Sequence, residues 1–348
     1  MSLRTLCIAM LAAAALPAGG ALAGPLSPPA GPVTPTHRTL TQVEPRTPVG
    51  PETTPGDDDY SPSVYKITLP GSYYLTGDVI GESGKHGIEI TAQDVTLDLN
   101  GFTVRGVPGS LSGIVHTAQS RAVRVRNGFV EGWGSRGVMI AQGLVNGTNA
   151  VEDLTVRDCG SFGIELMGTA VRCIAANNGN IGFYLSGEGV VRDCLATGNG
   201  SQGYHLFGRF VVEGCVATLN EGEGFFVANG ACHIRGCTAA HNAESGIYVA
   251  GSGSIIEGNL CRGNGTAIPD GAGIYVLNSI SDVRVDSNHV TQNDYGIRVE
   301  GSSSFIIRNT ARANAQNIVV SGVGNTYGPT VTTTGQIGTT SPWANFAN

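Results

Sequence analysis

One four-residue phrase recurs at a nearly constant interval along this chain: a glycine, an apolar residue, a variable residue and a second apolar residue. In the middle of the chain it begins at Gly182, Gly203, Gly224 and Gly246, at spacings of 21, 21 and 22 residues. A period in this range predicts a solenoid, in which each repeat buries its apolar face only against its neighbours. Further copies begin at Gly87, Gly113, Gly137, Gly163, Gly273 and Gly296. The repeat therefore predicts about ten coils.

The composition agrees with an all-β solenoid. Glycine supplies 52 of 348 residues and charged residues only 14%, which suits many tight turns and a small charged surface. With 41% apolar residues the chain is too hydrophobic to be disordered. Parallel crossovers are right-handed, so we expect a right-handed parallel β-helix. The net charge of -7 and the absence of a Lys/Arg cluster argue against a nucleic-acid partner, which needs a basic surface.

The N-terminal residues predict export. Residues 1–23 combine Arg4, an apolar run from Leu6 to Leu16 and small residues before position 24, which is typical of a signal peptide. The run is too short to span a membrane, and no later segment is long enough. We therefore expect a secreted or periplasmic protein without a membrane span. Residues 24–62 are rich in Pro, Thr and Gly and predict a linker.

The remaining chain divides into a solenoid and a tail. Residues 63–325 are expected to form the β-helix, with Tyr65–Leu69 and Tyr73–Thr76 forming an N-terminal cap. Residues 326–348 leave the period, and we expect Trp343 and Phe346 to fold onto the last coil as a C-terminal cap. Both caps would cover unpaired strand edges.

Two segments resemble a known family. The run from Gly71-Ser-Tyr-Tyr-Leu-Thr-Gly77 to Asp94-Val-Thr-Leu-Asp-Leu-Asn-Gly-Phe-Thr-Val-Arg105 resembles the opening of secreted bacterial right-handed parallel β-helix proteins of the pectate-lyase-like superfamily. Tyr-Gly-Pro and Pro-Trp-Ala-Asn-Phe near the end resemble their closing segments. The resemblance covers roughly residues 64–348 and implies the architecture. It implies nothing about the substrate, because a fold does not determine a function.

A second phrase predicts two columns of side chains inside the solenoid. Its first position holds cysteine and then asparagine, and its second position, five residues later, holds asparagine throughout. The first column is Cys173, Cys194, Cys215, Cys237, Asn259, Asn288 and Asn309, and the second is Asn178, Asn199, Asn220, Asn242, Asn264, Asn293 and Asn314. Equivalent residues of parallel coils lie one strand spacing apart, so amides in a column can hydrogen-bond to one another. We expect free buried thiols rather than disulfides, and no metal or cofactor.

The variable residue of the glycine phrase should point outward, one in each coil. These residues are Glu89, Val115, Met139, Glu165, Tyr184, His205, Phe226, Tyr248, Tyr275 and Arg298. Five consecutive members are aromatic or His. Such a row resembles the carbohydrate-facing surfaces of polysaccharide-active β-helix proteins, so we expect substrate binding by Glu165, Tyr184, His205, Phe226, Tyr248 and Tyr275. The alternative is that aromatic residues simply favour strands and stack, or lie beneath the tail or a partner subunit.

Catalysis by this row is a further hypothesis. Polyuronide lyases and epimerases need a base, an acid and a group that neutralises the sugar carboxylate. His205 and Tyr184 are candidates for base and acid, with Arg209 as the neutraliser. The chain lacks the Tyr-Gly-x-Asp-Pro-His segment of alginate epimerases, the Asp pair and Gly-His-Gly of polygalacturonases, and the stacked carboxylates of the calcium site of pectate lyases. Whether the protein is an enzyme therefore stays open.

We thus expect an exported β-helix protein that binds or modifies a polysaccharide, acidic ones included, through the outward row. The alternative is a non-catalytic scaffold or adhesion protein of the cell envelope, for which the same face is a protein interface. One further acidic run, Asp57 to Asp59, fits either a calcium site or a solvated surface, and the second interpretation is the commoner one.

Overall fold

The computed structural model describes residues 44–118, 122–141, 148–265 and 271–348. The predicted signal peptide and residues 24–43 of the predicted linker lie outside the described residues. The chain divides into two compact units, Met1–Pro45 and Arg46–Asn348, and the fold below is that of the second unit. Within the described ranges, no helix is long and apolar enough to cross a membrane.

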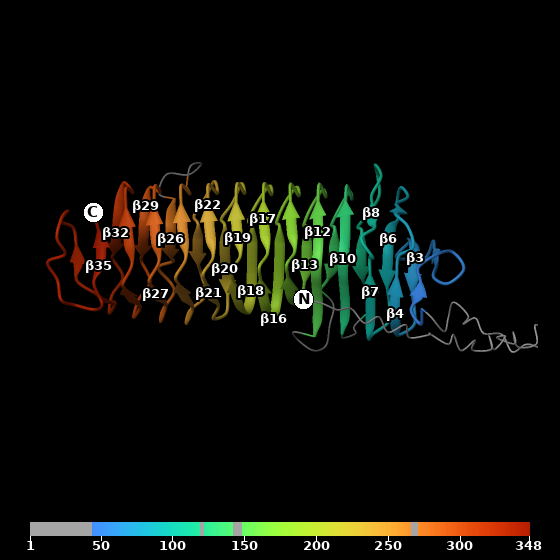
Figure 1. The fold of residues 1–348 in the computed structure, drawn as a ribbon, viewed down its shortest axis with the longest axis horizontal. Coiled ribbons are helices and arrows are strands. Elements are labelled where there is room, and N and C mark those ends of the chain that lie inside the picture. The colour runs from blue at the N-terminus through green and yellow to red at the C-terminus, as the bar shows by residue number, and fades with distance from the viewer. Residues whose placement is uncertain (1–43, 119–121, 142–147, 266–270) are drawn as a thin grey trace, which may run out of the picture. The chain divides into compact units, whose positions relative to one another are not determined.

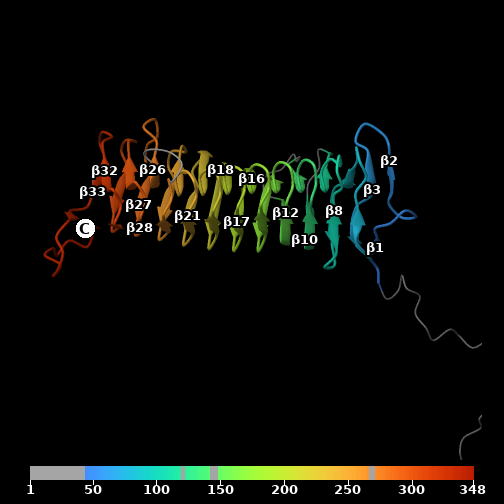
Figure 2. The ribbon, with the colours of Figure 1, turned by 90° about the horizontal axis from the view of Figure 1, so that it is seen from above.

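Residues 46–348 form a right-handed parallel β-solenoid, as predicted. Each turn contributes a strand to each of three columns, and each strand pairs in parallel with its equivalents in the neighbouring turns (Figures 1 and 2). The first column, which carries the glycine phrase, contains β3 (Ser63–Ile67), β6 (His86–Ile90), β9 (Ile114–His116), β11 (Val138–Ile140), β13 (Ile164–Leu166), the first part of β16 (Phe183–Arg192), the first part of β18 (Tyr204–Glu213), β20 (Phe225–Asn229), β23 (Ile247–Val249), β26 (Ala272–Val276), β29 (Tyr295–Val299) and β32 (Gln316–Val320).

The other two columns complete each turn. The second contains β4 (Gly71–Tyr74), β7 (Val95–Asp98), the first parts of β10 (Val123–Glu131) and β12 (Asn149–Arg157), β14 (Gly168–Val171), the later parts of β16 and β18, β21 (His233–Arg235), β24 (Ile255–Glu257), β27 (Arg284–Asp286), β30 (Phe305–Ile307) and β33 (Thr326–Tyr327). The third contains β5 (Val79–Ile80), β8 (Thr103–Arg105), the later parts of β10 and β12, β15 (Ile174–Ala176), β17 (Leu195–Thr197), β19 (Val216–Thr218), β22 (Thr238–Ala240), β25 (Leu260–Arg262), β28 (His289–Thr291), β31 (Thr310–Arg312) and β35 (Asn345–Ala347).

The solenoid has about 12 turns, two more than the glycine phrase predicts. The additional turns begin at β3 and β32, where the phrase has lost its glycine. In the interior, a Cβ at Gly203 would lie 2.7 Å from the Gly224 oxygen of the next turn. In the last turn Asn317 takes the glycine position, and its Oδ1 accepts hydrogen bonds from the backbone and side chain of Asn314. A side chain is tolerated at this position of the last turn because no further turn packs against it.

The N-terminal edge differs from the expectation. Strands β3 and β4, predicted to form a cap, are themselves the first turn of the solenoid. The strands that lie on this turn are β1 (Thr47–Pro48), which pairs in parallel with β4, and β2 (Pro55–Asp57), which pairs antiparallel with β3. Both fall within the range predicted to be a linker, because strands this short leave no periodic apolar pattern.

The C-terminal tail continues the solenoid. Strand β33 pairs with β30, and β35 pairs with both β31 and β34 (Thr330–Val331). Asn345 Oδ1 accepts hydrogen bonds from the backbone and side chain of Asn309, so the tail adds one more asparagine to the first interior column. Trp343 remains half exposed, at 51%, and forms a pocket wall described below.

Residues in the left-handed conformation make two bends in each turn. Asp193 and Leu219, with φ of 54° and 57°, each come directly before a residue of an interior column. A bend leaves backbone N–H groups without a strand partner, and these must be satisfied locally. The columns satisfy them: Asn199 N–H donates to Asn220 Oδ1 at 3.2 Å, and Cys237 N–H donates to Asn259 Oδ1 at 2.9 Å.

Both predicted interior columns are confirmed. Asn178, Asn199 and Asn220 form a buried ladder in which each Nδ2 donates to the Oδ1 of the next asparagine at 2.9–3.0 Å. The seven cysteines among the described residues are free and buried, as expected. Beside them, the rings of Phe183, Tyr204 and Phe225 stack in the core with centroids 4.9 and 4.7 Å apart and interplanar angles of 6°.

Candidate functional site

The predicted outward row exists with the predicted register. Each of its ten members pairs with the next across adjacent strands of the first column, from the pair Glu89 and Val115 to the pair Tyr275 and Arg298. Lys66 extends the row at one end and Val319 at the other. We use the term aromatic row for its middle part, Tyr184, His205, Phe226, Tyr248 and Tyr275. All five of these side chains are half-buried.

The rings of the aromatic row lie in contact but are turned relative to one another. Neighbouring centroids are 4.9, 4.9, 5.3 and 5.0 Å apart from Tyr184 to Tyr275. The interplanar angles are 29°, 69°, 49° and 85°. The core rings described above are parallel to within 6° and cover one another's faces. The outward rings are not stacked in this parallel way, so neighbouring rings leave part of the ring faces uncovered.

A cation lies at each end of the aromatic row. At one end Phe162 stacks on Tyr184 at 5.4 Å, and the Arg136 guanidinium lies over Phe162 while forming an ion pair with Glu165. Glu165 itself pairs with Tyr184 across adjacent strands and so lies next to the aromatic row, and substrate binding by Glu165 stays a prediction.

At the other end the Arg298 guanidinium lies 5.2 Å from the Tyr275 ring centre and 4.8 Å from that of Tyr295. Arg298 also pairs with Glu300 at 2.7 Å, and Glu300 accepts a hydrogen bond from the Tyr275 hydroxyl at 2.7 Å. Burial, together with this hydrogen bond, raises the pKa of Tyr275 to about 12. Both cations are thus fixed against the rings and paired with a carboxylate.

Carboxylates flank the middle of the row. Glu223 is buried and accepts a hydrogen bond from Gln202 Nε2 at 3.1 Å. Burial, followed by the charge of Glu223, raises the pKa of the nearby Glu244 carboxyl. Burial also raises the pKa of Tyr248, and the charges of Glu223, Glu300 and Glu244 add to this effect. The surface around Tyr248 is therefore negative.

His205 is a neutral ring inside the row. It lies between Tyr184 and Phe226, and its Nδ1 is buried and makes no hydrogen bond within the described structure. Burial lowers its pKa, since the charged imidazolium loses its hydration there. Among the described residues, no carboxylate is hydrogen-bonded to the imidazole, and the ring contacts its two aromatic neighbours instead.

This environment predicts a pH effect on stability. His205 titrates near 6.5 in the unfolded chain and at a lower pH in the folded one. Its contribution to the free energy of unfolding is therefore fully present above about pH 6.5 and is lost as the pH falls below that value. We expect the melting temperature of the wild type to fall more between pH 7.5 and pH 5 than that of His205→Phe. Equal decreases in the two proteins would contradict this assignment.

The three predicted catalytic residues do not lie together. Tyr184 and His205 are in ring contact, but Arg209 lies four residues beyond His205 in β18, a distance of about 13 Å along an extended strand. Arg209 pairs with Glu188 and lines a different cavity with Cys232 and His233. Arg209 is therefore separated from the other two side chains, and the catalytic role of the three stays a prediction.

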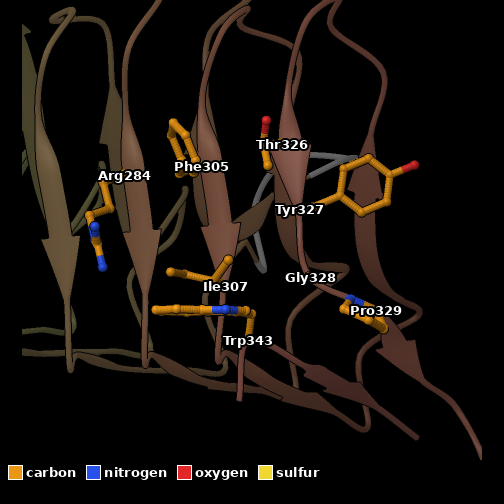
Figure 3. Close-up of a pocket in the computed structure, with 8 residues that line it drawn as sticks. All are labelled: Arg284, Phe305, Ile307, Thr326, Tyr327, Gly328, Pro329 and Trp343. Carbon is orange, nitrogen blue, oxygen red and sulfur yellow. The ribbon is translucent and has the colours of Figure 1, made fainter. Parts of the chain in front are cut away.

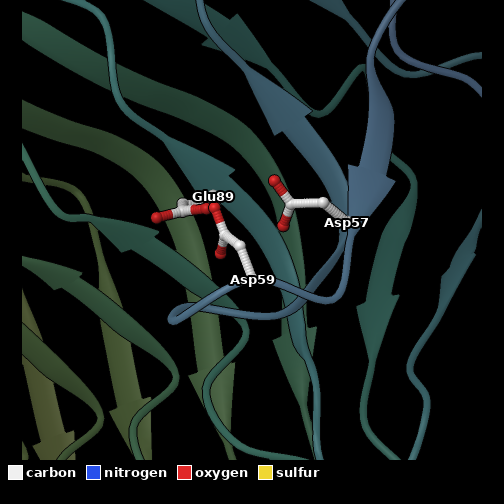
Figure 4. Close-up of side chains that lie close together, drawn as sticks. All are labelled: Asp57, Asp59 and Glu89. Carbon is white, nitrogen blue, oxygen red and sulfur yellow. The ribbon is translucent and has the colours of Figure 1, made fainter.

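The acidic run near the N-terminal edge surrounds a lysine. Asp57, Asp59 and Glu89 offer three carboxylates within 4.8 Å of one another (Figure 4). Lys66 Nζ lies 2.7 Å from oxygens of Asp57 and Asp59 and 3.1 Å from Glu89. Burial alone would lower the pKa of Lys66, but these three hydrogen bonds raise it. The ammonium group thus takes the place that a cation would need between the carboxylates.

Sequence analysis missed the residues beside the row. Phe162, Gln202 and Glu223 each come three residues before an outward residue and two residues before a first-column strand begins. Comparing this position across turns would have shown a second column of side chains next to the aromatic row. The outward position alone does not reveal it.

The fold and this row define a parallel β-solenoid with an aromatic column on one sheet. The family described as right handed beta helix region matches residues 112–259 and 208–337, which together span more than half of the chain. The protein belongs to this right-handed β-helix family. Among curated proteins, no sequence matches it.

Solved structures confirm the fold expected from the family resemblance. The A-module of mannuronan C-5 epimerase AlgE4 from Azotobacter vinelandii is similar with a TM-score of 0.56 and 16% identity, covering 75% of this chain and 90% of that one. The A-module of AlgE6 from the same organism gives 0.51 and 16%, covering 77% and 90%. Pectate lyase Pel9A gives 0.43 and 16%, covering 69% and 71%. At these identities the likeness concerns the fold alone.

Proposed function

We propose that this protein binds a polysaccharide along the aromatic row. The observation that carries the proposal is the contrast between two stacks of rings in one solenoid. The core rings are parallel to within 6°, whereas the outward rings from His205 to Tyr275 are turned by 49° to 85° and are partly exposed. Rings turned in this way offer apolar faces and polar edges to a ligand that runs along the column, and a sugar chain has both kinds of group.

The charges around the row favour a neutral glycan over an acidic one. Glu223 and Glu244 lie near Tyr248 and would repel a polyuronide, whereas the charge of Glu300 is paired with Arg298. The nearest cations, Arg136 and Arg298, are already paired with Glu165 and Glu300. A neutral chain is not repelled by these carboxylates and can donate hydrogen bonds from its hydroxyl groups to them. The acidic substrate considered from sequence is therefore not the one we propose.

Similar structures support a polysaccharide ligand but not its neutral charge. Two of them are modules of enzymes named for their action on mannuronan, which is an acidic polysaccharide, on the same type of scaffold. The predicted export through residues 1–23 would bring the row to extracellular or periplasmic glycans and stays a prediction.

Affinity electrophoresis of the full chain tests the proposal. The protein is run through gels containing neutral or acidic polysaccharides, beside Tyr248→Ala and the control Tyr60→Ala, which alters a fully exposed tyrosine outside the row. We expect retardation in a neutral gel and about tenfold weaker binding for Tyr248→Ala, equivalent to about 1.4 kcal/mol. The control should bind like the wild type.

Two results would overturn the proposal. Retardation that is equal for Tyr248→Ala and the wild type would move the glycan site away from the row. An absence of retardation, combined with an oligomer that Tyr248→Ala dissociates, would show that the row is a protein interface.

A further inference from the structure

A second aromatic surface lies at the C-terminal end of the solenoid, on the second column of strands. It is a cavity of about 360 Å³ whose walls include Arg284, Phe305, Ile307, Tyr327, Pro329 and Trp343 (Figure 3). Cavities of this size, mainly apolar and with a few polar groups, are typical of small-molecule sites. None of these residues belongs to the aromatic row.

The cavity forms where the tail meets the last strands. Arg284, Phe305 and Thr326 occupy one outward position in β27, β30 and β33. The tail returns beside them, and the Trp343 carbonyl accepts a hydrogen bond from Arg308 N–H at 3.4 Å. Figure 3 shows the Trp343 ring edge-on beneath Ile307, with Arg284 toward one end of the cavity and Tyr327 and Pro329 toward the other.

Three large aromatic side chains are exposed together in this place. Phe305 is 52% exposed, Tyr327 59% and Trp343 51%. Burying such rings would be favourable, so their grouping around a cavity indicates a surface that a ligand covers. A flat ring with an apolar face fits between walls of this kind.

Two guanidinium groups and two carboxylates lie at one end of the cavity. The buried Asp286 pairs with both Arg284, at 2.7 Å, and Arg308, so two guanidinium groups share one carboxylate. Burial alone would raise the pKa of Asp286, but hydrogen bonds from Arg308 and Arg284 lower it to about 2. Glu257, one turn earlier, is a second carboxylate: it contacts His233 at 3.3 Å, and its charge helps to raise the pKa of Arg308. The two carboxylates match the two guanidinium groups, so a ligand would bind through free N–H donors and not through an excess of positive charge.

Arg284 has N–H donors that Asp286 does not use and that can bind a ligand. Its Nε and Nη2 donate to Asp286 Oδ2 at 3.0 and 2.7 Å, and Nη1 takes no part in this contact. A guanidinium group has five N–H donors in a plane and can bind a carboxylate through two of them. Thr326 also lines the cavity, and Figure 3 shows its hydroxyl directed away from the Trp343 ring.

We propose that this cavity binds a uronic acid, with the sugar ring against Trp343 and its carboxylate on Arg284. The sugar can be a free monosaccharide or the end unit of an acidic polysaccharide. The site differs from the aromatic row in its sheet, its charge and its ligand. It does not depend on the proposed binding of a neutral glycan.

Tryptophan fluorescence of the full chain tests this proposal, because Trp133 is buried and Trp343 lines the cavity. The protein is titrated with glucuronate, galacturonate, a galacturonate trisaccharide, glucose and benzoate. We expect a saturable change with a uronate and none with glucose. Arg284→Gln should weaken uronate binding at least tenfold, and Arg235→Gln, which alters an arginine paired with Glu213 on the same column, should not.

The remaining outcomes separate the ligand sources and the two sites. Tighter binding of the trisaccharide than of the monosaccharide would indicate a polymer end, and equal binding would indicate a free sugar. Tyr248→Ala should bind uronate normally. The uronate test therefore remains valid even if the aromatic row binds no glycan. A response to benzoate alone, an equal response to glucose, or normal uronate binding by Arg284→Gln with an unchanged melting curve would overturn the proposal.

Discussion

Asn220→Ala is expected to lower the free energy of unfolding by about 3 kcal/mol or more. The Asn220 Oδ1 accepts hydrogen bonds from the backbone and side chain of Asn199, and its Nδ2 donates to the Ala196 carbonyl at 3.2 Å. The substitution removes these three hydrogen bonds and the one that Asn220 Nδ2 donates to Asn242 Oδ1, while Asn199 Nδ2 keeps its bond to the Ala175 carbonyl. Each unsatisfied buried group costs about 1–3 kcal/mol.

Urea denaturation followed by circular dichroism measures this loss. The matched control is Asn180→Ala, since Asn180 lies in the same kind of turn with an exposed side chain. The control should change the free energy of unfolding by less than about 0.5 kcal/mol. A similar small change in both variants would mean that the asparagine ladder contributes little to stability.

Gly208→Ala is expected to lower the free energy of unfolding by about as much as Asn220→Ala. Gly208 has a φ of 146°, which side chains rarely adopt, and a Cβ there would lie 1.9 Å from the backbone oxygen of Gly187 in the preceding turn. Atoms cannot approach so closely, so two turns must separate or the strand must bend. We expect a loss of about 3 kcal/mol or more in the free energy of unfolding. Because Gly208 lies three residues after His205, the shift should also reduce glycan binding by the aromatic row.

Gly236→Ala separates the effect of crowding from that of backbone conformation. Gly236 also has a positive φ, 60°, but no atom lies within 4 Å of its added Cβ. Only the conformational cost of about 1 kcal/mol is expected there. If thermal denaturation showed equal losses for the two variants, close approach of the turns would not be what requires glycine at position 208.

The sequence predicted the aromatic row because the repeat determines it. With a period of 21 or 22 residues and parallel register, the residue after each glycine and its apolar neighbour must face outward, as Tyr184 and Tyr248 do. The free cysteines and the asparagine ladder follow from the same register. Periodicity carries this information without any knowledge of the three-dimensional contacts.

Features that break the repeat could not be predicted in this way. Strands β1 and β2 pair with the first turn although their short segments have no apolar pattern. The C-terminal cavity joins Arg284 and Phe305, which are periodic, to Trp343, which belongs to the tail. Arg209 seemed near His205 in sequence, but residues four apart in a strand are separated and meet different neighbours.

The most direct test of the central claim is a crystal structure of the full chain with an oligosaccharide cut from the polysaccharide that retards it. Our account predicts sugar units lying along Tyr184, His205, Phe226, Tyr248 and Tyr275, with hydroxyl groups directed toward Glu223 and Glu300. An oligosaccharide bound elsewhere on the solenoid, with the aromatic row uncovered, would contradict it.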